Sequence, residues 1–319
     1  MTENELGVLA ANALKKVARN EQIRHFIKES DIFYPLLFRA AQRFIVGEVR
    51  NDAVSKGQEL VQKGYGVSME YIGENISDEQ QSHEVKHEIM QVILESGDIG
   101  ASSTVSLDVS HLGLMIDEDL AYENLSELAC EANRLGKTIM IGAEESTKID
   151  RIIRLYKRIN EVYSNVGITL QAYLHRTEQD LEGILSCRGR IRLVKGAYQE
   201  PGELALPRSE QLDTKYIVLA ERLVATGRPI SIATHDAVII EQLEQRGVWD
   251  RPNAELEMLY GIRPELMKNM KMKGYPTRVY LTYGEKWHLY FFHRLSEYPP
   301  NVYRAIADMV ELQVEENKY

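Results

Sequence analysis

The segment Arg192-Leu-Val-Lys195-Gly-Ala-Tyr198 places two cations in and just after a short apolar run. Such cations need partners, because an unpaired charge inside a protein is very costly. Ion pairs with neighbouring carboxylates are one interpretation, and a site for an anionic or electron-rich ligand is the other. In the second interpretation, Gly196 and Ala197 would let the ligand approach the backbone closely, because they are small.

A second candidate is the segment Ile232-Ala-Thr-His235-Asp236. A lone histidine at the end of a strand is more often a structural hydrogen bonder than a catalyst. Together with Thr234, however, His235 could donate hydrogen bonds to ligand phosphates or to a ribityl chain. The sequence leaves both interpretations open.

The third candidate segment, residues 280–297, carries aromatic and charged residues at helical spacing. Four of them lie three, four and three positions apart: Trp287, Tyr290, Arg294 and Glu297. At that spacing they share one face of a helix. An aromatic stripe is usually core packing. A face that also carries an arginine and a glutamate is not purely apolar, so we interpret it as one wall of a ligand site.

The elements that must position these residues alternate along the chain. Residues 1 to about 62 carry apolar residues at three- and four-residue spacing, which predicts helices. Eight short β-prone runs follow, at 66–72, 104–109, 138–142, 167–172, 190–195, 229–233, 254–259 and 278–283. Helix-like stretches separate them, with opening signals such as Asp78 and Asp117. A last helix is expected from about 302 to 316.

Eight strands, each followed by a helix, predict an α/β fold: a parallel (βα)8 barrel of the TIM type. A doubly wound open sheet is the alternative, but it normally has fewer strands, and no GxGxxG motif follows any strand. We expect residues 1–62 to form a helical segment packed on the barrel. Residues 63–319 are expected to form the barrel, with an extra C-terminal helix.

In such barrels the chemistry lies where strands end and the following loops begin. The polar residues at these places are Glu70, Glu74, Asp108, His111, Glu144, Gln171, Tyr173, Arg192, Lys195, Tyr198, Thr234, His235, Glu257, Tyr260, Tyr280 and Tyr283. The sequence therefore predicts a crowded polar mouth.

Composition argues against several classes of protein. A net charge of −10 would repel the phosphates of a nucleic acid. No uncharged apolar run approaches the roughly 18 residues of a membrane span. The two cysteines, Cys130 and Cys187, fit a reducing compartment, so we expect a cytoplasmic protein, with peripheral contact at the inner membrane face left open. Dispersed histidines without an HExxH motif predict no metal site, and no GxSxG motif marks a hydrolase.

Segments across nearly the whole chain resemble the proline dehydrogenase family, the monofunctional bacterial flavoenzymes of proline oxidation. The matching segments are 43–48, 71–74, 111–114, 170–173, 175–178, 192–198, 233–235, 258–261 and 280–297. Among them, Arg-Leu-Val-Lys-Gly-Ala-Tyr is highly specific. The resemblance implies a distorted (βα)8 barrel that holds FAD non-covalently at the C-terminal ends of its strands.

The resemblance also implies roles for individual residues. Arg192 resembles the arginine near the flavin N5, where a cation stabilises the anionic reduced flavin. Gln171 resembles the glutamine at the isoalloxazine ring. The rest of the cofactor wall is matched by Lys195, Gly196, Ala197, Tyr198, Thr234, His235 and Glu297. The wall of the substrate pocket is matched by Tyr198, Leu259, Tyr280 and Tyr290.

The chain departs from the family pattern where the family binds the substrate carboxylate. The lysine after the second strand is replaced by Asp108, and the first of two arginines on the last helix is replaced by His293, so that only Arg294 remains. Glu74, which resembles the usual partner of the missing lysine, is kept.

Two further positions differ. The family's aspartate at the end of the third strand is Gly142, which we expect to leave room for a larger substrate, and its glutamine before Met-Leu-Tyr-Gly is Glu257. Losing a charge-assisted partner typically costs about 2–5 kcal/mol, so the loss of the two cations at positions 108 and 293 disfavours free proline as the substrate. Glu74 and Asp108 would repel each other unless one is protonated or a cation, such as a substrate nitrogen, lies between them. A lysine from elsewhere that restores the clamp is the alternative.

The sequence therefore predicts a FAD-dependent dehydrogenase that oxidises a C–N or N-adjacent bond of a small amine or imino-acid-like substrate other than free proline, in a specialised biosynthetic pathway. The residues expected at the chemistry are Asp108, Arg192, Tyr280, His293 and Arg294, and those expected at the substrate also include Glu74, Gly142, Leu259 and Tyr290. Two alternatives stay open: a true proline dehydrogenase that passes electrons to a quinone, and a non-catalytic flavin-binding protein. The sequence does not decide between quinone and oxygen as acceptor.

Overall fold

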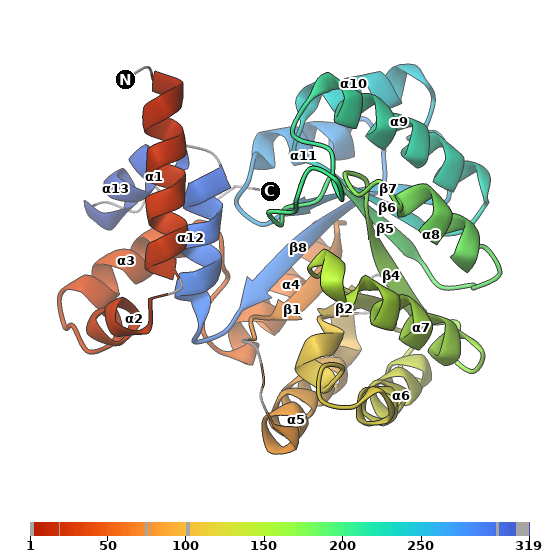
Figure 1. Cartoon of the computed structure of the whole chain (residues 1–319), viewed down its shortest axis with the longest axis horizontal. Helices are drawn as coiled ribbons and strands as arrows, with labels where there is room; N and C mark the ends of the chain where they lie inside the picture. Colours follow the sequence, from red (N-terminus) through yellow and green to blue (C-terminus); the bar gives the residue numbers. More distant parts are fainter. Residues whose placement is uncertain are drawn as a thin grey trace.

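The computed structural model describes residues 3–18, 20–73, 76, 78–99, 103–297, 300–310 and 319. Its strands are β1 (Gly66–Tyr71), β2 (Ser103–Leu107), β3 (Thr138–Ile141), β4 (Val166–Gln171), β5 (Ile191–Val194), β6 (Ile230–Ala233), β7 (Ala254–Leu259) and β8 (Thr277–Tyr283). They pair in parallel and in chain order, and β8 closes the barrel against β1 (Figure 1). The predicted (βα)8 barrel is confirmed.

Helices follow the strands and cover the outside of the barrel. They are α5 (Glu79–Glu95), α6 (Glu118–Arg134), α7 (Ile149–Asn160), α8 (Thr177–Ile184), α9 (Glu210–Ala225), α10 (Ala237–Gln245) and α11 (Pro264–Met272), with short 3-10 turns η1 (Ser96–Ile99), η2 (Val109–Leu112) and η3 (Ser146–Lys148). The predicted opening signals are present, because Asp78 accepts a hydrogen bond from the Gln81 amide and Asp117 accepts from the amides of Asp119 and Leu120.

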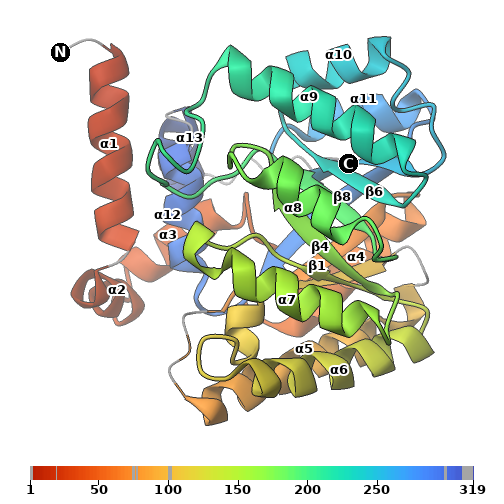
Figure 2. The ribbon, with the colours of Figure 1, turned by 45° about the vertical axis from the view of Figure 1, so that its right-hand side comes forward.

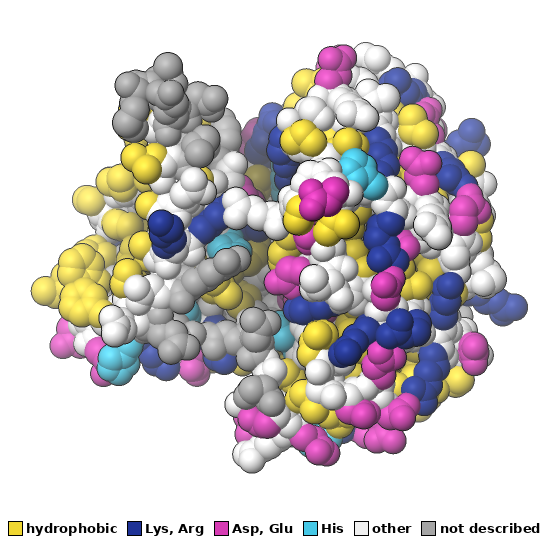
Figure 3. All heavy atoms as spheres, in the orientation of Figure 1, with side chains coloured by type: hydrophobic (Ala, Val, Ile, Leu, Met, Phe, Trp, Pro, Cys, Tyr) yellow, Lys and Arg dark blue, Asp and Glu magenta, His cyan; other side chains and the backbone are white. Residues whose placement is uncertain are grey.

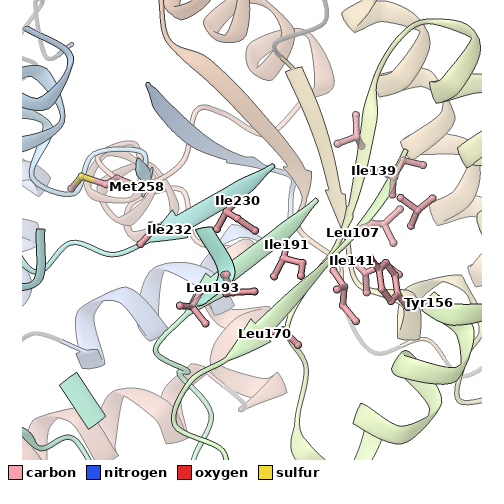
Figure 4. Close-up of a cluster of buried hydrophobic side chains, with 14 of the residues drawn as sticks. Leu107, Ile139, Ile141, Tyr156, Leu170, Ile191, Leu193, Ile230, Ile232 and Met258 are labelled. Carbon is pink, nitrogen blue, oxygen red and sulfur yellow. The ribbon is translucent and has the colours of Figure 1, made fainter. Parts of the chain in front are cut away.

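Aliphatic side chains from alternate strand positions build the core between the sheet and its helices. Figure 4 shows this core, with labelled side chains from the strands beside Tyr156 of α7: Leu107, Ile139, Ile141, Leu170, Ile191, Leu193, Ile230, Ile232 and Met258. Each fully buried side chain of this size contributes about 1.5–3 kcal/mol to folding. The positions between them point the other way, into the barrel, and apart from Met140 these are polar.

In the described part of the chain, the helix that follows β8 packs mainly on other helices. Helix α4 (Arg50–Gln62), which precedes β1, packs against β1 and β8, while α12 (Trp287–Glu297) packs on α1 (Glu3–Ala18) and α3 (Phe33–Ala41) (Figures 1 and 2). Helix α12 is thereby displaced from the flank of the barrel. Its position is fixed by helices from the other end of the chain.

A second hydrophobic core joins the two ends of the chain. We call the group of α1, α2 (Glu21–Lys28), α3, α12 and α13 (Pro300–Val310) the helical arm. Trp287 lies at its centre against Tyr34 and Phe38, and Asp308 of α13 binds Arg43. The last helix was predicted to reach residue 316, and residues 311–318 lie outside the described ones. Figure 3 shows hydrophobic side chains gathered over α2 and α3, and charges of both signs over the barrel.

Within the described part of the chain, no helix is both long enough and apolar enough to cross a membrane.

Candidate active site

The interior of the barrel is built in polar layers, because alternate strand residues point inward. In the layer nearest the N-terminal ends of the strands, Glu255 receives hydrogen bonds from Arg190 Nη1 at 2.5 Å, from Arg278 Nε at 2.6 Å and from the Ser231 hydroxyl at 2.6 Å. Burial alone would raise the pKa of Glu255, but Arg278 and Arg190 outweigh it and lower the pKa to about 2. This layer is a buried carboxylate held by two cations.

The next layer contains Arg192. Its Nε and Nη2 donate to the two oxygens of Glu257 at 2.6 and 2.9 Å, and Nη2 also donates to Ser106 at 3.0 Å. The Ser68 hydroxyl completes the layer by donating to Glu257 at 2.6 Å. Both charged side chains are almost fully buried, at 5% and 1% exposed. Of the two interpretations open for Arg192, the ion pair is present, and it neutralises the cation at this depth.

Glu70 and Tyr280 lie beside Arg192 towards the C-terminal ends of the strands. The Arg192 guanidinium carbon is 4.8 Å from the centre of the Tyr280 ring, a cation–π distance. Burial raises the pKa of Glu70, although a hydrogen bond from Tyr280 and the charges of Arg192 and Arg294 oppose the shift. Burial and the negative charge of Glu70 raise the pKa of Tyr280, which remains a protonated phenol at neutral pH.

Asp108 follows β2 and lies among carboxylates. Burial raises its pKa well above the usual value, and the charges of Glu144 and Glu70 raise it further, while Lys148 opposes them. We call Glu70, Asp108 and Glu144 the acid cluster. The negative charges that act on Asp108 in the described part of the chain include those of Glu144 and Glu70, so the repulsion predicted between Asp108 and Glu74 stays a prediction. Glu74, the partner expected from the sequence, lies outside the described residues.

The expected room at Gly142 is occupied. A Cβ placed on Gly142 would lie 2.1 Å from Asp108 Oδ1, so the space that the missing side chain leaves is filled by the Asp108 carboxylate. The prediction of a larger pocket at Gly142 is wrong, because the aspartate on the neighbouring strand supplies the carboxylate that position 142 lacks.

The lysine nearest to this cluster does not restore a carboxylate clamp. Lys148 Nζ lies 2.9 Å from Glu144 Oε2 and 2.9 Å from Glu145 Oε2. Glu144 also accepts a hydrogen bond from the Ser110 amide at 3.0 Å. Because two protein carboxylates already hold Lys148, it offers little charge to a substrate carboxylate.

Asp108 leads to a prediction about stability. Its folded-state pKa is raised, so the native protein keeps a proton that the unfolded chain releases above about pH 4. Stability should therefore fall as the pH rises from about 4 towards the raised pKa. In Asp108→Asn this loss should be absent, so that the variant gains up to about 1.4 kcal/mol per pH unit over the wild type in that range. Urea unfolding at several pH values measures it, with Asp119→Asn on the surface of α6 as the control; a pH-independent difference would contradict the prediction.

The face of α12 divides between two environments. Trp287 donates from Nε1 to Glu48 at 3.0 Å and packs in the helical arm, so its expected place in a ligand wall is wrong: the spacing does not reveal which helix packs on that end of α12. Arg294 lies further along, with Nη2 2.6 Å from Glu297 Oε1 and its guanidinium carbon 5.0 Å from the centre of the Tyr290 ring. Its Nε is buried without a hydrogen-bond partner among the described residues.

Charged and phenolic groups from the barrel act on Arg294. Its neighbours include Glu297, Tyr290, Glu70 and Tyr198, which raise its pKa against the effect of burial. His293 precedes it on α12 and accepts a hydrogen bond at its carbonyl from the Ser296 hydroxyl at 2.8 Å. Helix α12 thus brings one arginine towards the acid cluster.

His235 is a neutral donor. Its Nε2 accepts a hydrogen bond from the Leu259 amide at 2.9 Å, so the ring proton resides on Nδ1. Burial, Arg294 and Arg263 lower the pKa of His235 to about 3, which leaves the ring uncharged at neutral pH. Thr234 accepts a hydrogen bond from the Asp236 amide at 3.2 Å.

Lys195 and Gly196 both lie against other residues of the protein. Lys195 Nζ lies 2.6 Å from Asp213 and 3.0 Å from Asp236, carboxylates at the two neighbouring helices. Gly196 has a φ of +111°, and a Cβ on it would lie 2.2 Å from the Tyr173 ring. The glycine admits that ring, and its expected place in the cofactor wall stays a prediction. Beyond the exposed Ala197, the Tyr198 hydroxyl donates to the Ala143 carbonyl at 3.0 Å.

The close approach at Gly196 predicts a large effect of a single methyl group. Gly196→Ala should lower the free energy of unfolding by about 2–4 kcal/mol, because a strained φ costs about 1–3 kcal/mol and the contact with Tyr173 adds an overpacking cost. Gly227→Ala is the matched control, since its φ is +74° and nothing lies within 4 Å of the added Cβ. Chemical unfolding of both variants compares them, and equal losses would show that the Tyr173 contact adds nothing.

Three polar groups on adjacent strands fit a flavin. Gln171 donates from Nε2 to the Glu144 carbonyl at 2.9 Å, and its Oε1 is buried with no hydrogen-bond partner in the described residues. Arg192 uses Nε and Nη2 within the barrel, and its Nη1 has no acceptor in the part of the chain that the structure describes. His235 carries a hydrogen on Nδ1. An acceptor, a cationic donor and a neutral donor match the mixed polar groups of FAD.

Three residues at the mouth have no role assigned from the sequence. Glu70 and Glu144 were expected there without a function, and Lys148 was not expected there. Glu70 could have been found from its inward position two residues after Ser68, and Lys148 from its position four residues after Glu144.

Comparison with known proteins gives consistent matches. The family model described as proline dehydrogenase matches residues 53–298. Proline dehydrogenase 2 of Bacillus subtilis is 33% identical over 275 residues, which cover 85% of this chain and 91% of that protein. The proline dehydrogenase of Deinococcus radiodurans is 29% identical over 312 residues, which cover 95% of this chain and 98% of that protein.

Solved structures share the fold. Proline utilization A (PutA) from Bdellovibrio bacteriovorus, inactivated by N-propargylglycine, superposes with a TM-score of 0.76 at 16% identity. The match covers 98% of this chain and 39% of the PutA chain. PutA from Bradyrhizobium japonicum (mutant D779W) gives a TM-score of 0.69 at 17% identity and covers 86% of this chain and 32% of that one.

Proposed function

Because the chain belongs to the proline dehydrogenase family, we propose that its substrate is a small amine or imino-acid-like compound with a basic nitrogen, other than free proline. The family assignment makes the protein a FAD-dependent dehydrogenase that acts on a CH–NH donor. A changed carboxylate clamp suits an enzyme of a specialised biosynthetic pathway better than one of proline catabolism.

One observation carries this proposal: Asp108, at the position where the family pattern has a lysine, belongs to the acid cluster. The raised pKa of Asp108 reflects burial beside Glu144 and Glu70, whose effect outweighs the opposing charge of Lys148. A buried carboxylate gains most from a proton or a positive charge at short range. A substrate ammonium group would supply that charge, whereas a substrate carboxylate would be repelled.

Different residues of the chain then bind the cofactor and orient the substrate. Gln171 Oε1, Arg192 Nη1 and His235 Nδ1 would hold the cofactor, together with Lys195, Thr234 and Glu297. Bound FAD supplies an acceptor for the hydride that leaves the substrate carbon. The acid cluster orients the substrate nitrogen, and an ionised carboxylate of the cluster takes its proton, so that loss of the hydride and the proton leaves a C=N bond. The half-buried phenols of Tyr198 and Tyr280 help to exclude water from this region.

The test is anaerobic mixing of the FAD-loaded protein with pyrrolidine and with proline, which differ by the carboxylate. We expect pyrrolidine to bleach the flavin absorbance at least about tenfold faster, because a repelled carboxylate costs 2 kcal/mol or more. Bleaching by proline alone would reject the proposed substrate class. A flavin that dithionite reduces and no amine reduces would mark a non-catalytic protein.

A second candidate function is oxidation of proline itself, with electrons passed to a quinone. It is favoured by Arg294, whose Nε is buried without a hydrogen-bond partner among the described residues, and by the similarity to proteins named proline dehydrogenase. In this case Arg294 would bind the carboxylate nearly alone, with a protonated His293 beside it. Oxygen remains the other acceptor to be tested, by reoxidation of the reduced protein in air.

A further inference from the structure

Glu257 is the only carboxylate that hydrogen-bonds Arg192 in the described part of the chain. The pair is bidentate, is buried on both sides and joins β5 to β7 across the barrel interior. A bidentate pair of this kind fixes the orientation of the guanidinium as well as its charge. Arg192 can therefore present only Nη1 and a largely cancelled charge to whatever binds above it.

The layer below, which contains Glu255, differs from the layer of Arg192 in its net charge. Glu255 faces two arginines, Arg190 and Arg278, so that layer carries an excess of positive charge. The layer of Arg192 has one cation and one anion and is neutral. A neutral side chain at position 257 would leave Arg192 directly beneath the barrel mouth without its hydrogen-bonded carboxylate, and with only the opposing charge of Glu70 beside it.

We propose that Glu257 sets the reduction potential of the bound flavin by cancelling the charge of Arg192, and that it lowers this potential. The inference rests on the proposed function, because it requires FAD at the mouth. A flavin gains negative charge when it is reduced, so a nearby cation favours the reduced form and a nearby carboxylate opposes it. The low local dielectric keeps both effects strong.

The consequence concerns the substrate. A flavin of lower potential is a weaker oxidant, so the site suits a substrate that releases its hydride readily. An amine whose product is stabilised by conjugation with the new C=N bond is such a donor. The carboxylate at position 257 thus acts with the acid cluster to select electron-rich, basic substrates.

The experiment compares FAD-loaded wild type and Glu257→Gln in anaerobic equilibrium with a redox dye, without any substrate. The glutamine keeps the shape and can still accept from Ser68. We expect the ratio of reduced to oxidised flavin at a fixed dye potential to rise at least about tenfold, which is about 30 mV for a two-electron couple. An unchanged or lowered ratio would overturn the proposal.

Two further variants separate a local charge effect from a general disturbance. Glu255→Gln removes the same charge two residues earlier on β7, about 7 Å further from the mouth, and should shift the ratio less. Arg192→Met combined with Glu257→Gln should give a ratio of reduced to oxidised flavin between that of Arg192→Met alone and that of Glu257→Gln alone, because the two charges act in opposite directions. Equal shifts in Glu255→Gln and Glu257→Gln would also reject the proposal. Failure of the wild type to take up FAD would instead reject the proposed function.

Discussion

Replacing Asp108 with lysine and His293 with arginine in one chain is expected to raise kcat/KM for free proline by at least about a hundredfold. Each change restores a cation where the family clamps a carboxylate, and each charge-assisted contact is worth about 2 kcal/mol or more. The new lysine would lie beside Glu70 and Glu144, whose charges now raise the pKa of Asp108. Gly142 provides the space, because the Asp108 carboxylate that fills it is removed.

Steady-state oxidation of proline with an artificial electron acceptor measures this effect. The control carries the same changes of charge far from the mouth: Asp250→Lys with His83→Arg, both at exposed positions. We expect no gain in the control. High proline activity in the wild type, unchanged by the substitutions, would favour the second candidate function and contradict the first.

The second large effect is expected from breaking the Arg192–Glu257 pair. Arg192→Met alone should lower the free energy of unfolding by about 3–5 kcal/mol, because it leaves a buried carboxylate without its cation. Arg192→Met combined with Glu257→Gln should recover most of this loss, since the uncompensated charge is gone. Flavin reduction by the best amine should be about 100-fold slower in the double variant than in the wild type, because the Nη1 donor is missing.

Urea unfolding and anaerobic rapid mixing measure the two effects on the same samples. Arg190→Met provides the control, because Arg190 binds Glu255 one layer deeper. It should cost stability without slowing flavin reduction. A double variant that recovers both stability and rate would mean that Arg192 has only a structural role.

The sequence was sufficient for the barrel but not for every helix. Apolar residues at alternate positions predict the strands, and the strand ends agree within two residues, because burial on the outer face of the sheet determines them. The place of α12 was not predictable. Its spacing defines a face, but only the folded arm shows that Tyr34 and Phe38 cover Trp287.

The candidate site shows the same limit. Position at a strand end predicts that Asp108, Gln171 and Arg192 lie near the mouth. Their partners depend on distances across the barrel: Arg192 meets Glu257, which is 65 residues away in the sequence, and Asp108 fills the space at Gly142. A sequence shows which side chains point inward, whereas side-chain length and strand register decide which of them meet.

The most direct test of the account is a crystal structure of the protein with FAD and pyrrolidine, prepared without oxygen. The account predicts the isoalloxazine ring at the barrel mouth, in contact with Gln171 and Arg192, and the amine nitrogen within hydrogen-bonding distance of Asp108 or Glu70. FAD bound away from the C-terminal ends of the strands, or an amine nitrogen placed away from both carboxylates, would contradict it.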